Sequence, residues 1–185
     1  MPRIVWEVKL EVGGAVKVAR PFDMRQAKGF DPNDQFYSDI SIKNGACGLI
    51  ANITAYAPTS EIAYKAALHF FGNMIDVLCF KIDLPLYLYY YHVTNRGNEE
   101  YTTKRILDKP LFEESFRIAR EYAVNTEKHA ILRALGWYRK GLMSSDPIEK
   151  FLSLWNVVES LGAKFHAQTD RTNNGSINQI YQCLL

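Results

Sequence analysis

The sequence predicts an α+β fold, in which an N-terminal antiparallel sheet with one packed helix is followed by an incomplete helical bundle. Near the N-terminus, apolar and polar residues alternate with a period of two, as in half-buried strands. After residue 110 the apolar residues recur every three or four positions, which is typical of amphipathic helices. A polar stretch separates the two patterns, so we expect an α+β domain at 1–94, a linker at 95–109 and a truncated helical bundle at 110–185.

Composition places the chain among ordinary globular proteins. Of its 185 residues, 48% are hydrophobic and 23% are charged, which excludes a largely disordered or collagen-like chain. The 22 Lys and Arg residues nearly balance the 20 Asp and Glu residues, so no strong overall field attracts nucleic acid or an anionic membrane. No apolar stretch reaches the roughly 18 residues of a membrane span, so we expect no membrane partner.

The cysteine pattern favours a reducing compartment. Cys47, Cys79 and Cys183 are widely spaced and form no CxxC pair, which excludes a zinc knuckle or a thioredoxin-like motif. We therefore predict reduced thiols and a cytoplasmic location.

The first strand is expected at 4–12, where Trp6, Val8 and Leu10 alternate with charged residues. Gly13-Gly14 then predicts a tight hairpin into a strand at 16–20. The polar residues of Pro21 to Asp34 indicate a loop.

Two more strands are expected at 36–43 and 48–56, joined by a hairpin at Asn44-Gly45. A long helix should follow Pro58-Thr59-Ser60, which offers a stop and an N-cap. Its apolar face consists of Ala63, Ala66, Ala67, Phe70, Met74, Ile75 and Leu78. A last strand is expected at 86–93, after Pro85.

Three helices are expected in the C-terminal half. The first opens at Pro110, and the second spans roughly Glu127 to Met143. The third has Asp146 as N-cap, with Glu149 closing a capping box. Because this third helix is apolar over more than half its circumference, we expect it in the middle of a bundle, antiparallel to the second. A further short helix is expected from Ser176 to Leu185.

Common catalytic signatures are missing from the sequence. It contains no GxxxxGK, HExxH, GxSxG or GxGxxG motif, and its four histidines form no ligand pair at helical spacing. We therefore predict no catalytic residue, no metal site and no cofactor.

Charged residues on the last two helices are the main candidates for a binding site. Glu159 falls within the apolar stripe of the third helix, where it serves either as a polar site residue or as an edge carboxylate paired with a cation. His129, Arg133 and Lys140 lie along one line of the second helix, with Arg139 nearby. This line is either a strip that meets phosphates or simply a solvated face.

Tyrosines give a second set of candidates. Tyr87, Tyr89 and Tyr91 fall on one face of the last strand, where they are either a ladder for stacking bases or part of a buried central strand.

Two stretches, 133–142 (RALGWYRKGL) and 150–161 (KFLSLWNVVESL), resemble the helical core of HEPN-like domains of the ApeA-like and MauJ-like variety. The resemblance covers about residues 111–161. It implies a helical bundle, often dimeric, that binds RNA or cuts it without metal. Glu159 matches the acidic position of the family pattern.

The family's nuclease motif, an Arg followed four to six residues later by a His, is absent from this chain. An endoribonuclease is expected only if residues beyond the C-terminus supply that motif. The sequence therefore predicts a HEPN-like module that binds RNA, a protein partner or a second copy of itself. The alternative is an accessory protein of methylamine utilisation that acts through protein contacts. A third possibility, an enzyme of the first domain, requires a pocket lined by the tyrosines and His92.

Overall fold

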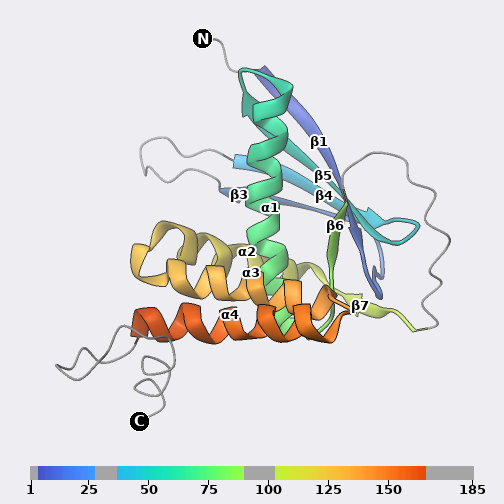
Figure 1. Cartoon of the computed structure of the whole chain (residues 1–185). Helices are drawn as coiled ribbons and strands as arrows, with labels where there is room; N and C mark the ends of the chain where they lie inside the picture. Colours follow the sequence, from blue (N-terminus) through green and yellow to red (C-terminus); the bar gives the residue numbers. More distant parts are fainter. Residues whose placement is uncertain (1–3, 28–36, 90–102, 166–185) are drawn as a thin grey trace, which may run out of the picture. The chain divides into compact units, whose positions relative to one another are not determined.

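The computed structural model describes residues 4–27, 37–89 and 103–165 and confirms the α+β fold. The chain forms two compact units, residues 1–120 and 121–185 (Figure 1). The predicted boundaries, with a linker at 95–109, stay a prediction, although residues 105–107 of that linker form a strand.

The first unit contains a five-stranded antiparallel sheet with the strand order β3-β4-β5-β1-β6. The strands of this sheet are β1 (Ile4–Gly13), β3 (Phe22–Ala27), β4 (Tyr37–Asn44), β5 (Gly48–Ala57) and β6 (Tyr87–Tyr89). The Asn44-Gly45 hairpin is confirmed, because β4 runs directly into an antiparallel pairing with β5. Residues 90–93 of the expected last strand lie outside the described residues.

One face of this sheet is dry and the other is open. The dry face comes from alternate residues of the strands, which pair in register across the sheet, as Val8 does with Ile53 and Ile53 with Ile40. Helix α1 (Ser60–Ile82) lies across this face (Figure 1), and its Met74 and Leu78 are fully buried. Each such buried side chain contributes about 1.5–3 kcal/mol, so the period-two pattern determines which face the helix covers.

Both ends of α1 are capped. The Thr59 side chain accepts a hydrogen bond from the Ile62 amide, which confirms the expected N-cap region. At the other end Asp83 adopts a left-handed conformation, and the Arg105 guanidinium donates to the Ile82 carbonyl oxygen at 2.8 Å. These contacts satisfy backbone groups that a helix end leaves without partners.

Two expectations for the region after β1 are wrong. Residues 22–27, expected in a loop, form β3, because Met24 points into the core while Asp23 and Arg25 stay wet. The strand after Gly14 does not form a hairpin with β1.

That strand, β2 (Val16–Val18), pairs in parallel with β7 (Arg105–Leu107). The Asn44 side chain fixes β2 by accepting from the Val18 amide at 2.8 Å and donating to the Val18 carbonyl at 2.9 Å. The sequence pattern predicted that β2 pairs with β1. The Asn44 side-chain amide instead makes the hydrogen bonds to the Val18 backbone that a neighbouring strand would make.

Helix α2 (Lys109–Val124) crosses the boundary of the two units, and its first part packs within the first unit. The Phe112 ring meets Phe22 edge-on at 5.5 Å between centroids, and Phe116 stacks on Phe70 at 5.0 Å. An ion pair between Lys81 and Glu114 joins α1 to α2 at the surface.

The second unit contains a short 3-10 turn, η1 (Thr126–Lys128), and two helices, α3 (His129–Met143) and α4 (Pro147–Phe165). The two helices lie side by side as an antiparallel hairpin (Figure 1). The helix expected at Ser176 to Leu185 lies outside the described residues.

The start of α4 is capped differently from the expected capping box. Asp146 is the N-cap, as expected, and its side chain accepts from the Ile148 amide at 2.8 Å. Glu149, however, accepts a hydrogen bond from the Ser144 hydroxyl at 3.2 Å instead of from the Asp146 amide. The Asp146 amide donates to that same hydroxyl, so Ser144 takes the place of a direct capping-box contact.

Candidate functional site

The outer face of α4 is a strip of exposed apolar side chains. Ile148 is 70% exposed, Phe151 62% and Phe165 52%, whereas the expected position in the middle of a bundle would bury them. Of the α4 residues, only Ser153 and Gly162 are buried. Within the described residues that expectation is therefore wrong, since only α3 packs closely along the opposite side of α4.

We call this strip the α4 seam, and its members share a spacing of three and four residues. The seam consists of the exposed Ile148, Phe151, Val158 and Phe165, the half-buried Trp155 and, between Val158 and Phe165, the buried Gly162. The Phe151 and Trp155 rings stack at 6.3 Å between centroids, which forms a continuous aromatic ridge near its N-terminal end. Leu152, 50% exposed, widens the strip on one side.

Contact with α3 determines which face of α4 is exposed. Gly141 lies against Ser153 and Leu154, so the small residues of both helices lie at their contact. At about 100° per residue, the seam residues then lie roughly opposite Ser153. The local amphipathicity and this one close contact together expose the seam.

Glu159 lies at the edge of the seam, seven residues after Leu152 on the same side of the helix. It is half-buried, and within the described part of the chain no ion pair or hydrogen bond involves it. Its half-buried position therefore differs from the deeply buried one that the helical pattern suggested.

The basic strip of α3 lies on the solvent side of that helix. His129, Arg133 and Lys140 are all exposed, and the Lys140 ammonium lies 4.9 Å from the centroid of the Trp137 ring. This cation–π contact holds an aromatic face beside a positive charge. The strip that the sequence predicted therefore lies on the exposed face of α3.

Two of the basic candidates make local contacts. A ring nitrogen of His129 lies 2.9 Å from the Ala123 carbonyl oxygen. Arg139 is half-buried on a different side of α3, where its guanidinium reaches the Met143 sulfur at 3.7 Å. Arg139 thus stands apart from the line of Arg133 and Lys140.

The tyrosine candidates are described only in part. Tyr87 is half-buried and pairs with Gly13 at the β6 edge, while Leu88 points toward Gly72 of α1. The alternation of strand residues therefore puts Tyr87 on the open face of the sheet. Tyr89 pairs with Glu11, but its side chain lies outside the described residues, as does all of Tyr91.

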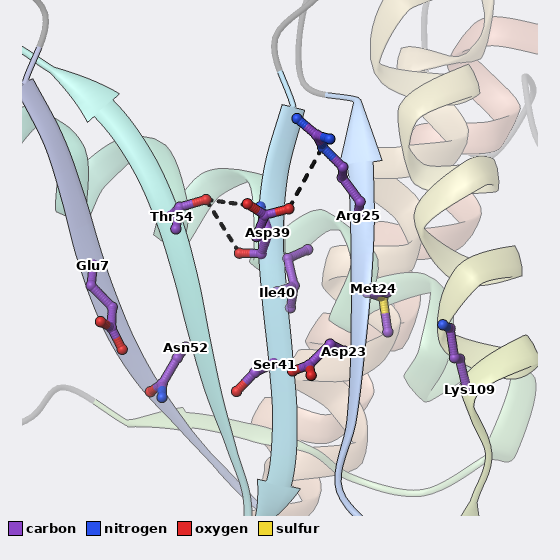
Figure 2. A pocket seen from close by; sticks show the side chains of 10 residues that line it. All are labelled: Glu7, Asp23, Met24, Arg25, Asp39, Ile40, Ser41, Asn52, Thr54 and Lys109. Atoms are coloured by element: carbon purple, nitrogen blue, oxygen red, sulfur yellow. Dashed lines mark hydrogen bonds and ion pairs between the residues drawn. The ribbon is translucent and has the colours of Figure 1, made fainter.

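The open face of the sheet also carries a shallow polar hollow of about 480 Å³ (Figure 2). It is lined by Glu7, Asp23, Met24, Arg25, Asp39, Ile40, Ser41, Asn52, Thr54 and Lys109. Arg25 and Asp39, which pair across the neighbouring strands β3 and β4, form an ion pair at 3.6 Å, and both side chains are about 70% exposed (Figure 2).

This hollow was missed from the sequence because the strand that contributes Asp23 and Arg25 was expected to be a loop. The sequence signal for the hollow is the set of alternating polar residues on four strands, but it can be interpreted only when the register of these strands is known. Its lining contains no tyrosine among the described residues. Tyr91 and His92 lie outside the described residues, so the pocket of an enzyme of the first domain stays a prediction.

Neither a metal site nor a membrane span is found in the part of the chain that the structure describes. No three His, Cys, Asp or Glu side chains there could hold a metal ion together. None of the helices described combines the length and the apolar composition that crossing a bilayer requires. Cys47 and Cys79 are free thiols, the second of them buried.

The fold and the seam define an α+β protein whose helical hairpin offers an apolar surface and, on another side, a basic one. Comparisons with models of protein families, with curated proteins and with solved structures find no match for this chain.

Proposed function

We propose that this chain is a binding module whose HEPN-like helical hairpin holds a protein partner through the α4 seam. The exposure of the seam is the observation that carries the proposal. A basic cleft of Arg133, Arg139 and Lys140 beside Glu159 would have favoured RNA, whereas an exposed apolar patch favours a protein. Arg139 lies away from the other two, and the seam is apolar.

The seam is large enough to matter energetically. Its side chains together expose roughly 400–500 Å² of apolar surface, taking about 150–250 Å² for a fully exposed large side chain. Covering that area contributes about 10 kcal/mol to the free energy of binding. The loss of translational and rotational freedom on association costs a similar amount. The balance corresponds to a reversible partner rather than a permanent one.

The same proposal includes the accessory role in amine utilisation, because an accessory protein of that kind also works through protein contacts. We place the module in the cytoplasm, where Cys47 and Cys79 would stay reduced. No RNA cleavage is proposed, since the sequence lacks the Arg and His pair on which that chemistry rests.

The proposal is tested by capture of partners from the source cell with the full chain and with a seam variant, Phe151→Asp plus Val158→Asp. Ile62→Asp is the matched control, because Ile62 is a 49% exposed apolar residue on another helix. A partner that binds the wild type and the control, but not the seam variant, supports the proposal. A partner retained equally by all three proteins contradicts it.

RNA is the second candidate ligand, favoured by the exposed cations of α3 and the Trp137 ring beside Lys140. Two exposed positive side chains, Arg133 and Lys140, give weak binding that falls steeply with salt. If RNA is bound, Arg133→Glu plus Lys140→Glu should abolish retention of labelled RNA at low salt, while the seam variant should retain it. Unchanged retention by the charge-reversed protein would exclude this strip as the RNA site.

A further inference from the structure

We infer that the α4 seam takes a single amphipathic helix of a partner protein, which carries Lys or Arg along the flank that faces Glu159. The inference rests on the proposed function and specifies the chemistry of the partner. Three features of the described residues support it: the spacing of the seam, the closure of one of its edges, and the charge on the other.

The spacing of the seam fits a helix. From Ile148 to Phe165 the seam positions are separated by three, four, three, four and three residues, which is the heptad pattern of a two-helix contact. Side chains at this spacing form knobs and holes for a second helix that crosses at about 20°. Because 17 steps of about 1.5 Å give roughly 26 Å, the partner helix needs about 18 residues.

One edge of the seam is closed by the hairpin itself. Leu154 lies on that side of α4 and packs against Gly141 of α3. Lys164, on the same side, forms an ion pair with Glu127 at 2.7 Å. A partner helix is therefore confined to the strip between this edge and the edge that carries Glu159.

The open edge carries one carboxylate beside the seam, that of Glu159. Glu159 and Leu152 lie seven residues apart along this edge, whereas Glu149 lies about 80° further round the helix and accepts a hydrogen bond from the Ser144 hydroxyl. Docking would remove more water from the half-buried Glu159, and desolvating a carboxylate without a partner is unfavourable. A basic side chain on the docked helix removes that cost, whereas an acidic one adds repulsion, so this edge selects among apolar helices.

The same charge disfavours a second copy of this chain as the occupant. In an antiparallel pair of helices, equivalent flanks face each other. Two copies of α4 would therefore bring their Glu159 edges together without a cation between them. A partner with basic residues on that flank is complementary, and a second copy is not.

The experiment uses the full-length chain and two designed 18-residue peptides with leucine at the heptad positions. One peptide carries Lys on its flanks and the other carries Glu, with all other residues identical. We expect the Lys peptide to gain helical circular dichroism on binding and to bind at least tenfold more tightly than the Glu peptide at low salt. Glu159→Lys should reverse that preference, and Val158→Asp should abolish binding of both peptides.

The outcomes separate this inference from the proposed function. Equal binding of the two peptides, or no reversal with Glu159→Lys, overturns the inference of a basic flank. Failure of both peptides with a folded chain that still captures a partner through the seam overturns the helical partner but leaves the proposed function standing. Self-association in sedimentation velocity that Val158→Asp removes would make a second copy the occupant and overturn the inference.

Discussion

Gly141 of α3 and Leu154 of α4 are in direct contact: a Cβ atom added to Gly141 would lie 3.1 Å from Leu154 Cδ2. The same atom would lie 3.4 Å from the Cβ of Ser153, which is almost completely buried. The two helices approach closely because a glycine and a serine face each other. This contact orients α4 so that the seam with Phe151 and Trp155 faces outward.

We predict that Gly141→Leu destabilises the protein by about 2–3 kcal/mol, because a large side chain at this contact forces the helices apart. Gly141→Ala should change stability by less than about 1 kcal/mol, since Leu154 can shift slightly and alanine favours a helix by about that amount. Urea denaturation followed by circular dichroism measures both.

Gly72→Ala is the control for that comparison. Gly72 lies within α1, and an added Cβ there would meet only the Leu88 side chain of β6, at an ordinary contact distance of 3.7 Å. We expect a gain of about 0.5–1 kcal/mol from reduced backbone freedom. Equal effects of Gly141→Leu and Gly72→Ala would contradict the close helix contact.

Gly48→Ala should be among the most damaging single substitutions in the sheet. Gly48 has φ +151°, and a Cβ there would lie 2.3 Å from the Val12 carbonyl oxygen. Both the backbone conformation and the collision with a fixed strand predict a loss of about 3 kcal/mol or more.

Gly45→Ala provides the comparison, because its added Cβ would meet the flexible Ile50 side chain at 2.9 Å and the Leu49 backbone only at an ordinary 3.4 Å. Thermal unfolding should show a much smaller loss for this variant. Similar melting temperatures for the two variants would argue against the tight pairing of β1 with the start of β5.

Asp146→Ala should lower stability by about 1 kcal/mol, because it removes the oxygen that accepts the Ile148 amide at the start of α4. Asp146→Ser keeps a hydrogen-bond acceptor at the same place, so it should lower stability by only a few tenths of a kcal/mol. Chemical denaturation of the two variants distinguishes loss of the cap from loss of charge.

Acid should weaken the contact between α1 and α2. The hydrogen bond and charge of Lys81 lower the pKa of Glu114 below its ordinary value. A depressed pKa in the folded state means that the stabilisation is present above the unfolded pKa, near pH 4, and is lost as the pH falls through the lower folded value.

The change is expected to be small because the Glu114 side chain is half exposed and solvent screens its charge. Glu114→Gln should therefore slightly reduce stability at pH 7 and make the decline between about pH 5 and pH 3 shallower. An identical pH profile for wild type and variant would show that the ion pair contributes nothing.

Local patterns predicted the strands and helices whose burial follows a simple period. The alternation of Val8 and Leu10 with charged residues predicted β1, and Asn44-Gly45 predicted the hairpin between β4 and β5. Asp146 predicted the start of α4. In these places the pattern of neighbouring residues indicates the local structure. The sequence alone was therefore sufficient to predict these elements.

Pairing between distant segments could not be obtained in the same way. Strand β3 was missed because Asp23 and Arg25 made its segment look polar, although they face the open side of the sheet. The hairpin expected after Gly13 does not form, because Asn44 and β7 hold β2 instead. The polar hollow depends on this register and so was missed with it.

For the candidate site, the sequence alone determined that α4 has a broad apolar face and that Glu159 lies along it. Only the tertiary structure decided that this face is exposed, since helical periodicity shows which residues share a side but not which side meets a neighbour. That choice was made by the small residues at the α3 contact, where Gly141 lets Leu154 pack closely and the larger side chains of the seam turn away.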